Sequence, residues 1–319
     1  MHKQRNPKRE KMLLRGYEKG AYGLDSVLDY ALTTVGGRWR EAESVILEMG
    51  TDAVEYACRV LEGRWEEAEP RLMRSSDTAV AYAVRVLKNR WTEAEPFIMQ
   101  MPSHAVLYAR AVLKGRWLDA EPMIMQSACA AEEYATTVLR TRWFDAEPAI
   151  SMSPDSSIAY ARNVIKARWR LAESEIIREP SSAVRYASEV LGGRWPEAES
   201  VIMQSSAEAV IYAMNVIKDR WPEAEAAIAS GVESEFLHML SEEDAAEKYA
   251  KEVLRHHWDE EVARKCSCWL YYYAKDVIGG KLPEELHNLM LVEAIKNPND
   301  PWVKKYFGAK KYQRPRHPR

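Results

Sequence analysis

Apolar residues recur at spacings of three and four in a segment that returns many times along the chain. In Ala105–Lys114 (AVLYARAVLK) they fall on one side of a helical wheel, which predicts a short amphipathic helix. A second segment follows, R-W-P-E-A-E-P-x-I-M-Q-S in its fullest form, and predicts a second short helix. Its first proline, as in Pro196 and Pro222, suits a first helical turn, where the amide has no partner.

A proline also occurs four residues further on in several copies. A proline that deep in a helix has no N–H to donate and collides with the preceding turn. We therefore expect the second helix of these copies to begin late or to bend. The prolines concerned are Pro70, Pro96, Pro122 and Pro148.

The two-helix unit repeats every 26 residues, as the tryptophans show. An Arg precedes each Trp, a Glu follows four residues later, and a Tyr-Ala pair begins nine residues earlier. Eight copies keep this register, with Trp at 39, 65, 91, 117, 143, 169, 195 and 221. After an insertion, Tyr249 with Trp258, and then Tyr273, mark two degenerate copies.

A unit this small cannot bury its own apolar face, so neighbouring units must stack. The predicted fold is all-α, an α-solenoid of about ten 26-residue helix-turn-helix repeats. Four segments are predicted: a basic N-terminal cap or tail (1–23), eight regular repeats (24–231), an insertion with two degenerate repeats (232–295), and a basic C-terminal tail (296–319). A glycine often follows the first helix and is interpreted as its stop, at Gly37, Gly63, Gly115 and Gly193.

Residues that are the same in every copy are interpreted as structural, because each copy meets the same neighbour. We expect Tyr and Trp to form two buried aromatic columns, and Arg and Glu to form a ladder between adjacent units with Arg stacked on Trp. The alternatives are a base-stacking platform and a phosphate-binding Arg row. Two copies represent the set: Tyr108, Arg116, Trp117, Glu121, Tyr134, Arg142, Trp143 and Glu147.

Positions that differ between copies are the candidates for partner binding. Relative to the Tyr they lie at −1, +2, +3 and +6, which share one face of a helix. The mixture of apolar and basic residues there favours a protein partner over nucleic acid, although an ordinary solvated face would show the same variation. The candidate residues are Leu107, Arg110, Lys114, Arg162, Lys166, Arg185, Ile211 and Met214.

Charge is unevenly distributed along the 319 residues. The formal net charge is −3, yet residues 1–20 carry seven Lys/Arg against two acids and residues 304–319 carry seven against none. The body between them is therefore acidic. Basic residues beside Tyr and Phe near the C-terminus are candidates for nucleic-acid binding: Lys304, Lys305, Lys310, Lys311, Arg314 and Arg316.

Chemistry-bearing motifs are missing from the sequence. It has no G-x-S-x-G, Walker loop or H-E-x-x-H. The group His256, His257, Cys266 and Cys268 has metal-ligand residue types, but its spacing matches no common zinc site. We predict a protein without enzymatic activity, cofactor or metal. Four cysteines, no signal peptide and no apolar run of about 20 residues favour an intracellular setting without a membrane span.

The unit at Tyr212–Glu225 (YAMNVIKDRWPEAE) resembles short helical repeats in uncharacterised proteins encoded by tailed bacteriophages. The resemblance implies a helical-repeat fold and a phage origin, and it implies no established activity. The leading hypothesis is a non-enzymatic interaction protein whose partner is a virion component or a host protein such as a defence factor, located in the host cytoplasm or the virion. The alternative is a nucleic-acid-binding scaffold that uses the basic termini or the Arg rows. Self-association of a basic end with the acidic body of another copy is a further prediction.

Overall fold

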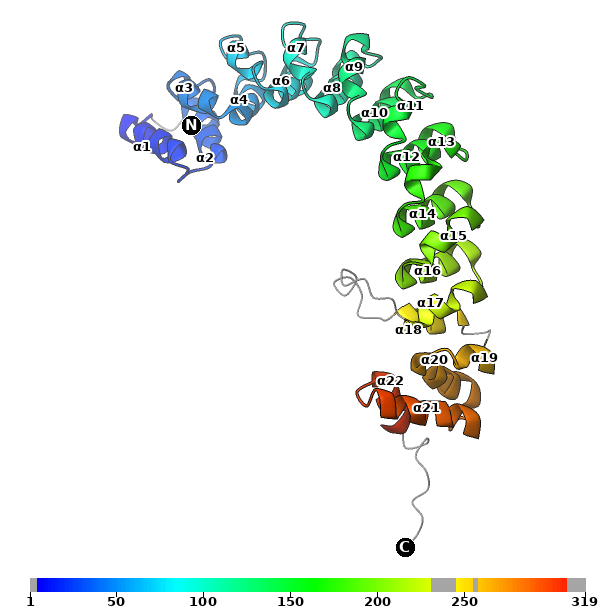
Figure 1. Cartoon of the computed structure of the whole chain (residues 1–319). Coiled ribbons are helices and arrows are strands. Elements are labelled where there is room, and N and C mark those ends of the chain that lie inside the picture. The colour runs from blue at the N-terminus through cyan, green and yellow to red at the C-terminus, as the bar shows by residue number, and fades with distance from the viewer. Residues whose placement is uncertain (1–4, 231–244, 255–257, 309–319) are drawn as a thin grey trace. The chain divides into compact units, whose positions relative to one another are not determined.

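The chain is a succession of short helices (Figure 1). The structure is a computed structural model that describes residues 5–230, 245–254 and 258–308, and within these ranges it contains helices and no strand. The all-α helical-repeat solenoid predicted from the sequence is confirmed. The chain divides into two compact units, Met1–Val164 and Ile165–Arg319, which are described separately.

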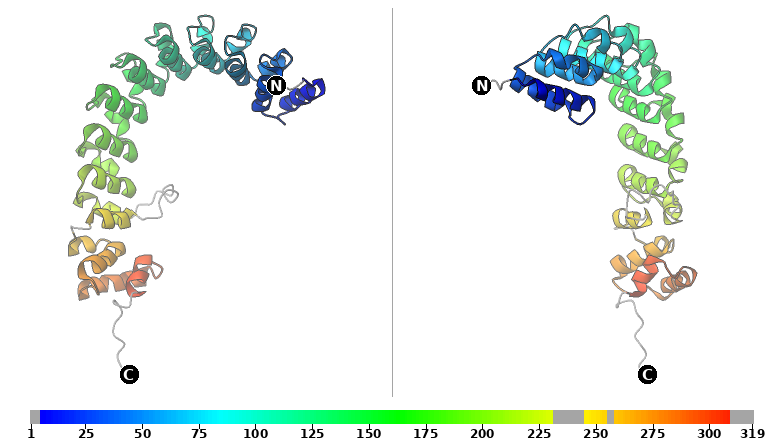
Figure 2. Two further views of the ribbon diagram at one scale, coloured as in Figure 1. Left: turned by 180° about the vertical axis from the view of Figure 1, so that it is seen from behind. Right: turned by 90° about the vertical axis from the view of Figure 1, so that its left-hand side faces the viewer.

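The first unit stacks two rows of helices, and both rows can be followed in Figures 1 and 2. The first helix of each repeat ends at its Tyr, and the second helix follows its Trp. The first helices are α2 (Leu24–Tyr30), α4 (Gly50–Tyr56), α6 (Ser76–Tyr82), α8 (Pro102–Tyr108), α10 (Ala128–Tyr134) and α12 (Pro154–Tyr160). The second helices are α3 (Arg40–Glu48), α5 (Glu69–Leu72), α7 (Glu95–Ile98), α9 (Glu121–Ile124, after the 3-10 turn η5, Leu118–Ala120) and α11 (Glu147–Ile150).

The second unit continues the pattern and then departs from it after repeat 8. Its helices are α13 (Arg170–Ile176), α14 (Pro180–Tyr186), α15 (Pro196–Ile202), α16 (Ser206–Tyr212), η10 (Pro222–Ala224), α17 (Glu225–Ser230), α18 (Ala245–Glu252), α19 (Glu260–Ala263), α20 (Ser267–Tyr272), α21 (Glu284–Lys296) and α22 (Pro301–Gly308). Most of the insertion predicted from residue 232 lies outside the described residues.

Every first helix of a regular repeat widens into a π-helical turn immediately after its Tyr, a feature the sequence did not predict. In the first unit these turns are η1 (Ala31–Val35), η2 (Ala57–Leu61), η3 (Ala83–Leu87), η4 (Ala109–Leu113) and η6 (Ala135–Leu139), with η7 (Ala161–Ile165) at its end. In the second they are η8 (Ala187–Leu191) and η9 (Ala213–Ile217), and a further π turn, η13 (Tyr273–Ile278), follows α20 in the degenerate copy of Tyr273. A single π turn often marks a functional site. Because this one recurs in each repeat, it belongs to the architecture.

The residue that ends each π turn has a left-handed backbone. Lys114 has φ 54°, and its backbone N–H donates to the carbonyl of Ala109. The predicted glycine stop is therefore one position too late, since Gly63, Gly115 and Gly193 have no positive φ and the residues before them do. Non-glycine residues take this conformation at Glu62, Lys88, Lys114, Arg140, Lys166 and Lys218.

The second α-helix begins late in the repeats that contain the deeper proline, as expected. It also begins late in the repeat of Trp221, at Glu225, although Ala226 occupies the proline's position there. In repeats with this proline the α-helix begins at the Glu four residues after Trp, as at Glu121, so that Pro122 falls in its first turn. Where serine replaces the proline, as at Ser174 and Ser200, the α-helix begins directly after Trp. Pro196 and Pro222 stand at the first position of their helices, as predicted.

The ends of the chain carry partial repeats. Helix α1 (Pro7–Glu18) packs on α2 and α3, and its segment Arg5–Glu10 (RNPKRE) matches the Arg, Pro and Glu of R-W-P-E-A-E with Asn6 in place of Trp. At the other end, α22 packs on α20 and α21 and buries Trp302, Val303 and Tyr306. The prediction of a tail over 296–319 is thus wrong for residues 301–308. None of the described helices is long and apolar enough to cross a membrane.

Candidate interaction surface

The repeated Arg and Glu bind each other within one repeat. Arg116 donates from Nε and Nη2 to the two carboxylate oxygens of Glu121, at 2.6 and 2.9 Å, and the Glu121 side chain is almost completely buried. The same bidentate pair recurs in all eight regular repeats, with Nε–Oε1 distances of 2.5–2.8 Å. The predicted ladder between adjacent units is therefore wrong for the repeated Glu, because the turn after Trp brings the Arg and Glu of one repeat together. Arg38 and Arg168 also donate to a different glutamate of the next repeat, Glu67 at 3.0 Å and Glu197 at 3.2 Å.

The tyrosine hydroxyl forms hydrogen bonds to the preceding repeat. Tyr134 accepts a hydrogen bond from the backbone N–H of Trp117 at 2.6 Å and donates to Oε1 of Glu121 at 3.2 Å, both in the preceding repeat. The amide-to-hydroxyl bond recurs eight times at 2.6–2.8 Å. A buried amide, a hydroxyl and a carboxylate thus satisfy one another at the junctions where all three are bonded.

The aromatic rings of the repeat are core, as predicted. Tyr108 and Tyr134 are fully buried, and Trp117 and Trp143 are 3% and 4% exposed. Within a repeat the rings lie 5.1 Å apart, centroid to centroid, in both cases. Rings buried this deeply cannot stack on bases, so the base-platform alternative is wrong for them. Burial raises the pKa of Tyr108 and of Tyr134 to about 12.

The arginine row is exposed but electrically balanced. Arg116 and Arg142 keep 53% and 42% of their side-chain surface, while each binds its buried Glu with two hydrogen bonds. The glutamates hold the pKa of these guanidinium groups above the usual value. Arg142 lies over the ring of Phe144 at 4.7 Å from its centroid rather than on a Trp as expected. A row of neutralised pairs is a poor track for phosphates, which counts against the Arg-row alternative.

Three predicted partner-binding residues, Leu107, Ile211 and Met214, are half-buried on the first-helix row. Others are exposed and engaged in polar contacts. Arg110 donates to Glu133 of the next repeat at 2.9 Å, and Arg185 pairs with Glu189. The exposed Arg162 contacts its neighbour Asn163. Leu107, Arg110 and Lys114 lie together on one repeat, whereas Arg185, Ile211 and Met214 belong to the second unit.

Lys114 and Lys166 occupy the left-handed caps of their helices, with φ 54° and 55°, and their side chains are exposed. Their place at the +6 position is set by the end of the π turn. Backbone geometry, not a shared helix face, therefore decides the direction in which these two lysines project.

Two exposed apolar residues were missed from the sequence. Leu118 and Phe144 occupy the position after Trp in adjacent repeats and are 64% and 67% exposed, although other regular repeats place Arg, Glu, Thr or Pro there. The change from these residue types to Leu and Phe was visible in the sequence. It was overlooked because the residues around it follow the repeat motif closely. Leu118 lines an open hollow together with Asn89, Arg90, Val112, Leu113, Arg116, Trp117 and Asp119.

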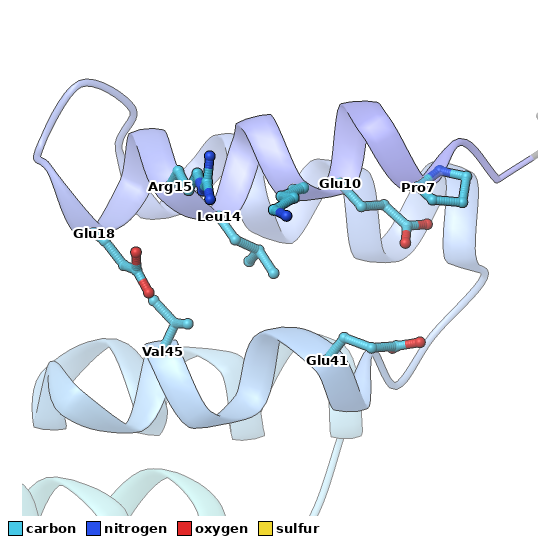
Figure 3. Close-up of a pocket in the computed structure, with 8 residues that line it drawn as sticks. Pro7, Glu10, Leu14, Arg15, Glu18, Glu41 and Val45 are labelled. Carbon is cyan, nitrogen blue, oxygen red and sulfur yellow. The ribbon is translucent and has the colours of Figure 1, made fainter.

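A second hollow lies between α1 and α3 at the N-terminal end (Figure 3). Leu14 points from α1 toward α3, and Val45 points back from α3, so the hollow has a narrow apolar floor. Charged side chains surround this floor: Glu10, Lys11, Arg15, Glu18 and Glu41. Arg5 already binds two of these carboxylates, Glu10 and Glu41.

The basic C-terminal candidates divide between a helix and residues that the structure leaves undescribed. Lys304 and Lys305 are exposed on α22, where Lys304 donates to Asn299 and Lys305 lies over the ring of Trp302 at 3.7 Å from its centroid. Lys310, Lys311, Arg314 and Arg316 lie outside the described residues. Helix α22 thus presents two lysines on its surface.

No group of three or more His, Cys, Asp or Glu side chains that could hold a metal ion occurs in the ranges that the structure describes. Cys268 is buried in α20 and Cys266 is half-buried at the start of that helix, while His256 and His257 lie outside the described residues. The chain matches no protein-family model, no curated protein and no solved structure.

Proposed function

We propose that this chain is a non-enzymatic helical-repeat protein that binds a protein partner along the turns after Trp117 and Trp143, in the fourth and fifth repeats. The observation that carries the proposal is the exposed pair Leu118 and Phe144, which we call the edge patch together with Val112, Leu113, Arg116 and Arg142. Apolar side chains exposed at the same position of adjacent repeats can form one binding surface, and exposed apolar patches on proteins often mark interaction sites. An aromatic ring with an adjacent arginine is also typical of binding hot spots.

The chemistry of the edge patch indicates what its partner presents. Leu118 and Phe144 would enter an apolar surface, and burying each of them fully would contribute about 1.5–3 kcal/mol. In the free chain the hydrogen bonds of Arg116 and Arg142 to their glutamates come from Nε and Nη2. The partner surface should therefore combine apolar residues with hydrogen-bond acceptors that reach Nη1.

A comparison of surface variants in affinity capture tests this function. The wild type, the double variant L118S/F144S and the control M152S would be used as bait. Met152 is a suitable control because it is 67% exposed in the same unit and is not one of the edge patch residues. A stoichiometric partner recovered by the wild type and by M152S, and lost with L118S/F144S, supports the proposal. Equal recovery by all three baits, or no stoichiometric partner, contradicts it.

The identity of the partner rests on the resemblance to phage-encoded repeat proteins alone. On that basis we propose a virion component or a host protein, such as a defence factor, in the virion or the host cytoplasm. Mass spectrometry of purified virions and of infected-cell cytoplasm distinguishes these locations. Finding the chain in neither fraction of a phage infection would contradict the phage assignment.

A nucleic-acid-binding scaffold is the second candidate, and the exposed Lys304 and Lys305 on α22 favour its terminal version. Binding to single-stranded DNA or RNA should then fall steeply with salt, because lysine contacts with phosphates release counterions. The variant K304E/K305E should lower the affinity and flatten the salt dependence. An unchanged salt slope for this variant, and for a chain ending at residue 308, would rule the terminal version out.

A further inference from the structure

Helix α21 carries apolar residues on the face that points away from the core. Its inner face is formed by Leu286, His287 and Met290, all buried. On the opposite side Leu289 and Val292 are 37% and 46% exposed, and Ile295 beside them is 80% exposed. A helix that is apolar on both sides is typical of a buried helix. Within the described residues, only the inner side is covered.

The exposed stripe is bounded by opposite charges. Glu285, Leu289, Val292 and Lys296 follow the spacing i, i+4, i+7 and i+11, which places all four on one face of the helix. Each of the four is exposed. Glu285 also receives a hydrogen bond from Arg264 at 3.0 Å, at Oε2, and its side chain remains 82% exposed.

The stripe is complementary to itself in the antiparallel direction. The midpoint between Leu289 and Val292 is also the midpoint between Glu285 and Lys296. A two-fold axis through this point therefore sets Leu289 of one helix against Val292 of the other and, about 16 Å apart along the helix, sets each Glu285 against a Lys296. It also sets Asn288 beside Glu293 of the second copy. A surface that matches itself about one axis is the requirement for a closed dimer.

We infer that α21 is the interface of a homodimer, with two copies of the chain packed antiparallel through Glu285, Leu289, Val292 and Lys296. Helices in such a pair lie about 8–10 Å apart, so the apolar residues of both copies leave water together. One helix pair buries less than the about 1,600 Å² of a standard interface. The dimer is accordingly weak, and its population depends on protein concentration.

Charge reversal tests the antiparallel pairing without relying on an unfolded variant. In E285K both meeting positions are lysine, and in K296E both are glutamate, so each variant alone should associate at least about tenfold more weakly than the wild type. An equal mixture of the two restores both Glu–Lys contacts and should dimerise as the wild type does. Sedimentation velocity of the full chain over a concentration series measures each case.

Apolar variants and a matched control complete the experiment. V292D should abolish the concentration-dependent mass increase, and V277D, at a valine 48% exposed outside the stripe, should leave it unchanged. Circular dichroism and melting curves establish that each variant is folded. A wild type that stays monomeric at every accessible concentration, a dimeric V292D, or a mixture of E285K and K296E that stays monomeric would each overturn the inference.

Discussion

Each junction tyrosine provides a hydrogen-bond acceptor inside the protein for a backbone amide of the preceding repeat. Its hydroxyl satisfies a Trp amide that the turn leaves without a helical partner. The indole is used differently, since Nε1 of Trp39, Trp65, Trp117, Trp143, Trp195 and Trp221 is buried without a hydrogen-bond partner. Tryptophan therefore serves the repeat through its ring area, and tyrosine through its hydroxyl as well as its ring.

Removal of one such hydroxyl should destabilise the protein measurably. Tyr134→Phe leaves the Trp117 amide buried without an acceptor, which should lower the free energy of unfolding by about 1–3 kcal/mol. Urea denaturation followed by circular dichroism measures this change. Tyr22→Phe is the control, because that ring is 40% exposed, and it should stay within about 0.5 kcal/mol of the wild type. Equal effects of both substitutions would contradict the role of the hydroxyl.

The same hydroxyls predict alkaline unfolding. Burial raises the pKa to about 12 in Tyr82, Tyr108, Tyr134, Tyr186 and Tyr212. Above the ordinary pKa of about 10, the unfolded chain loses these protons before the folded chain does, so stability falls as pH rises from 10 to 12 and is unaffected below 10. Tyrosinate absorbance should rise together with the loss of helical signal. Ionisation that is complete near pH 10 with the helices intact would contradict this.

The sequence revealed that these residues are structural but not which bonds they form. Recurrence in eight copies identified Tyr, Arg, Trp and Glu as packing residues. It could not reveal that Tyr134 binds Glu121, because a fixed period gives every pair of repeated positions the same regularity. The edge patch was missed for the opposite reason. Leu118 and Phe144 are the large apolar residues at a position where the other regular repeats have Arg, Glu, Thr or Pro, and their exposure depends on the turn geometry.

At the level of the element, the distinctive feature of the first helix is the π turn and left-handed residue at its C-terminal end. Its apolar spacing of three and four fits an α-helix throughout, so the pattern contains no indication of the π turn that follows Tyr. The left-handed residue follows that turn at the sixth position after Tyr, where six of the repeats have no glycine. The deeper proline was easier to interpret, because its missing N–H restricts where a helix can begin.

Substitutions at two adjacent positions test the location of this cap. Lys114→Gly should raise the free energy of unfolding by up to about 1 kcal/mol, because glycine adopts positive φ without a steric penalty. Lys114→Val should lower it by about 1–2 kcal/mol, since a β-branched residue is strongly disfavoured there. Gly115→Ala, at an ordinary backbone angle and with room for a Cβ, should be tolerated. Thermal melts measure all three, and a destabilising Gly115→Ala with a neutral Lys114→Val would contradict this assignment.

At the scale of the whole chain, the repeat motif accounts for the hydrogen bonds of the regular repeats. The partial repeats at the two ends use other residues to make the corresponding bonds. Asn6 replaces the tryptophan of a repeat and caps α1 by accepting from the amides of Lys8 and Arg9. Tyr30 still bonds to this segment, through the Asn6 amide and Glu10. At the other end Tyr306 accepts from Leu282 and contacts His287 in place of a glutamate. Both partial repeats were hidden from the sequence because the tryptophan that marks a repeat is absent from them.

Deletion of the N-terminal cap should loosen the adjacent repeat and leave distant ones intact. Without residues 1–22, the buried Val27, Leu28 and Tyr30 would lose their cover, and a repeat array unfolds first at an uncapped end. Hydrogen exchange should accelerate in α2 and α3 and stay unchanged in α8 and η4. Unchanged protection of α2 would show that α1 is dispensable.

The hydroxyl bond between repeats also has a genetic consequence. Its amide donor and hydroxyl acceptor are the same at each regular junction, so this bond does not make a repeat specific for its neighbour. Removing residues 109–134 would join Tyr108 to Ala135 and preserve every spacing on both sides of the seam. In-frame recombination between copies could therefore shorten or lengthen this array in one step, with the hydroxyl bond kept at the new junction. The length of the array would then evolve through the number of repeats. Single-codon changes, such as those at Leu118 and Phe144, would alter which partner it binds.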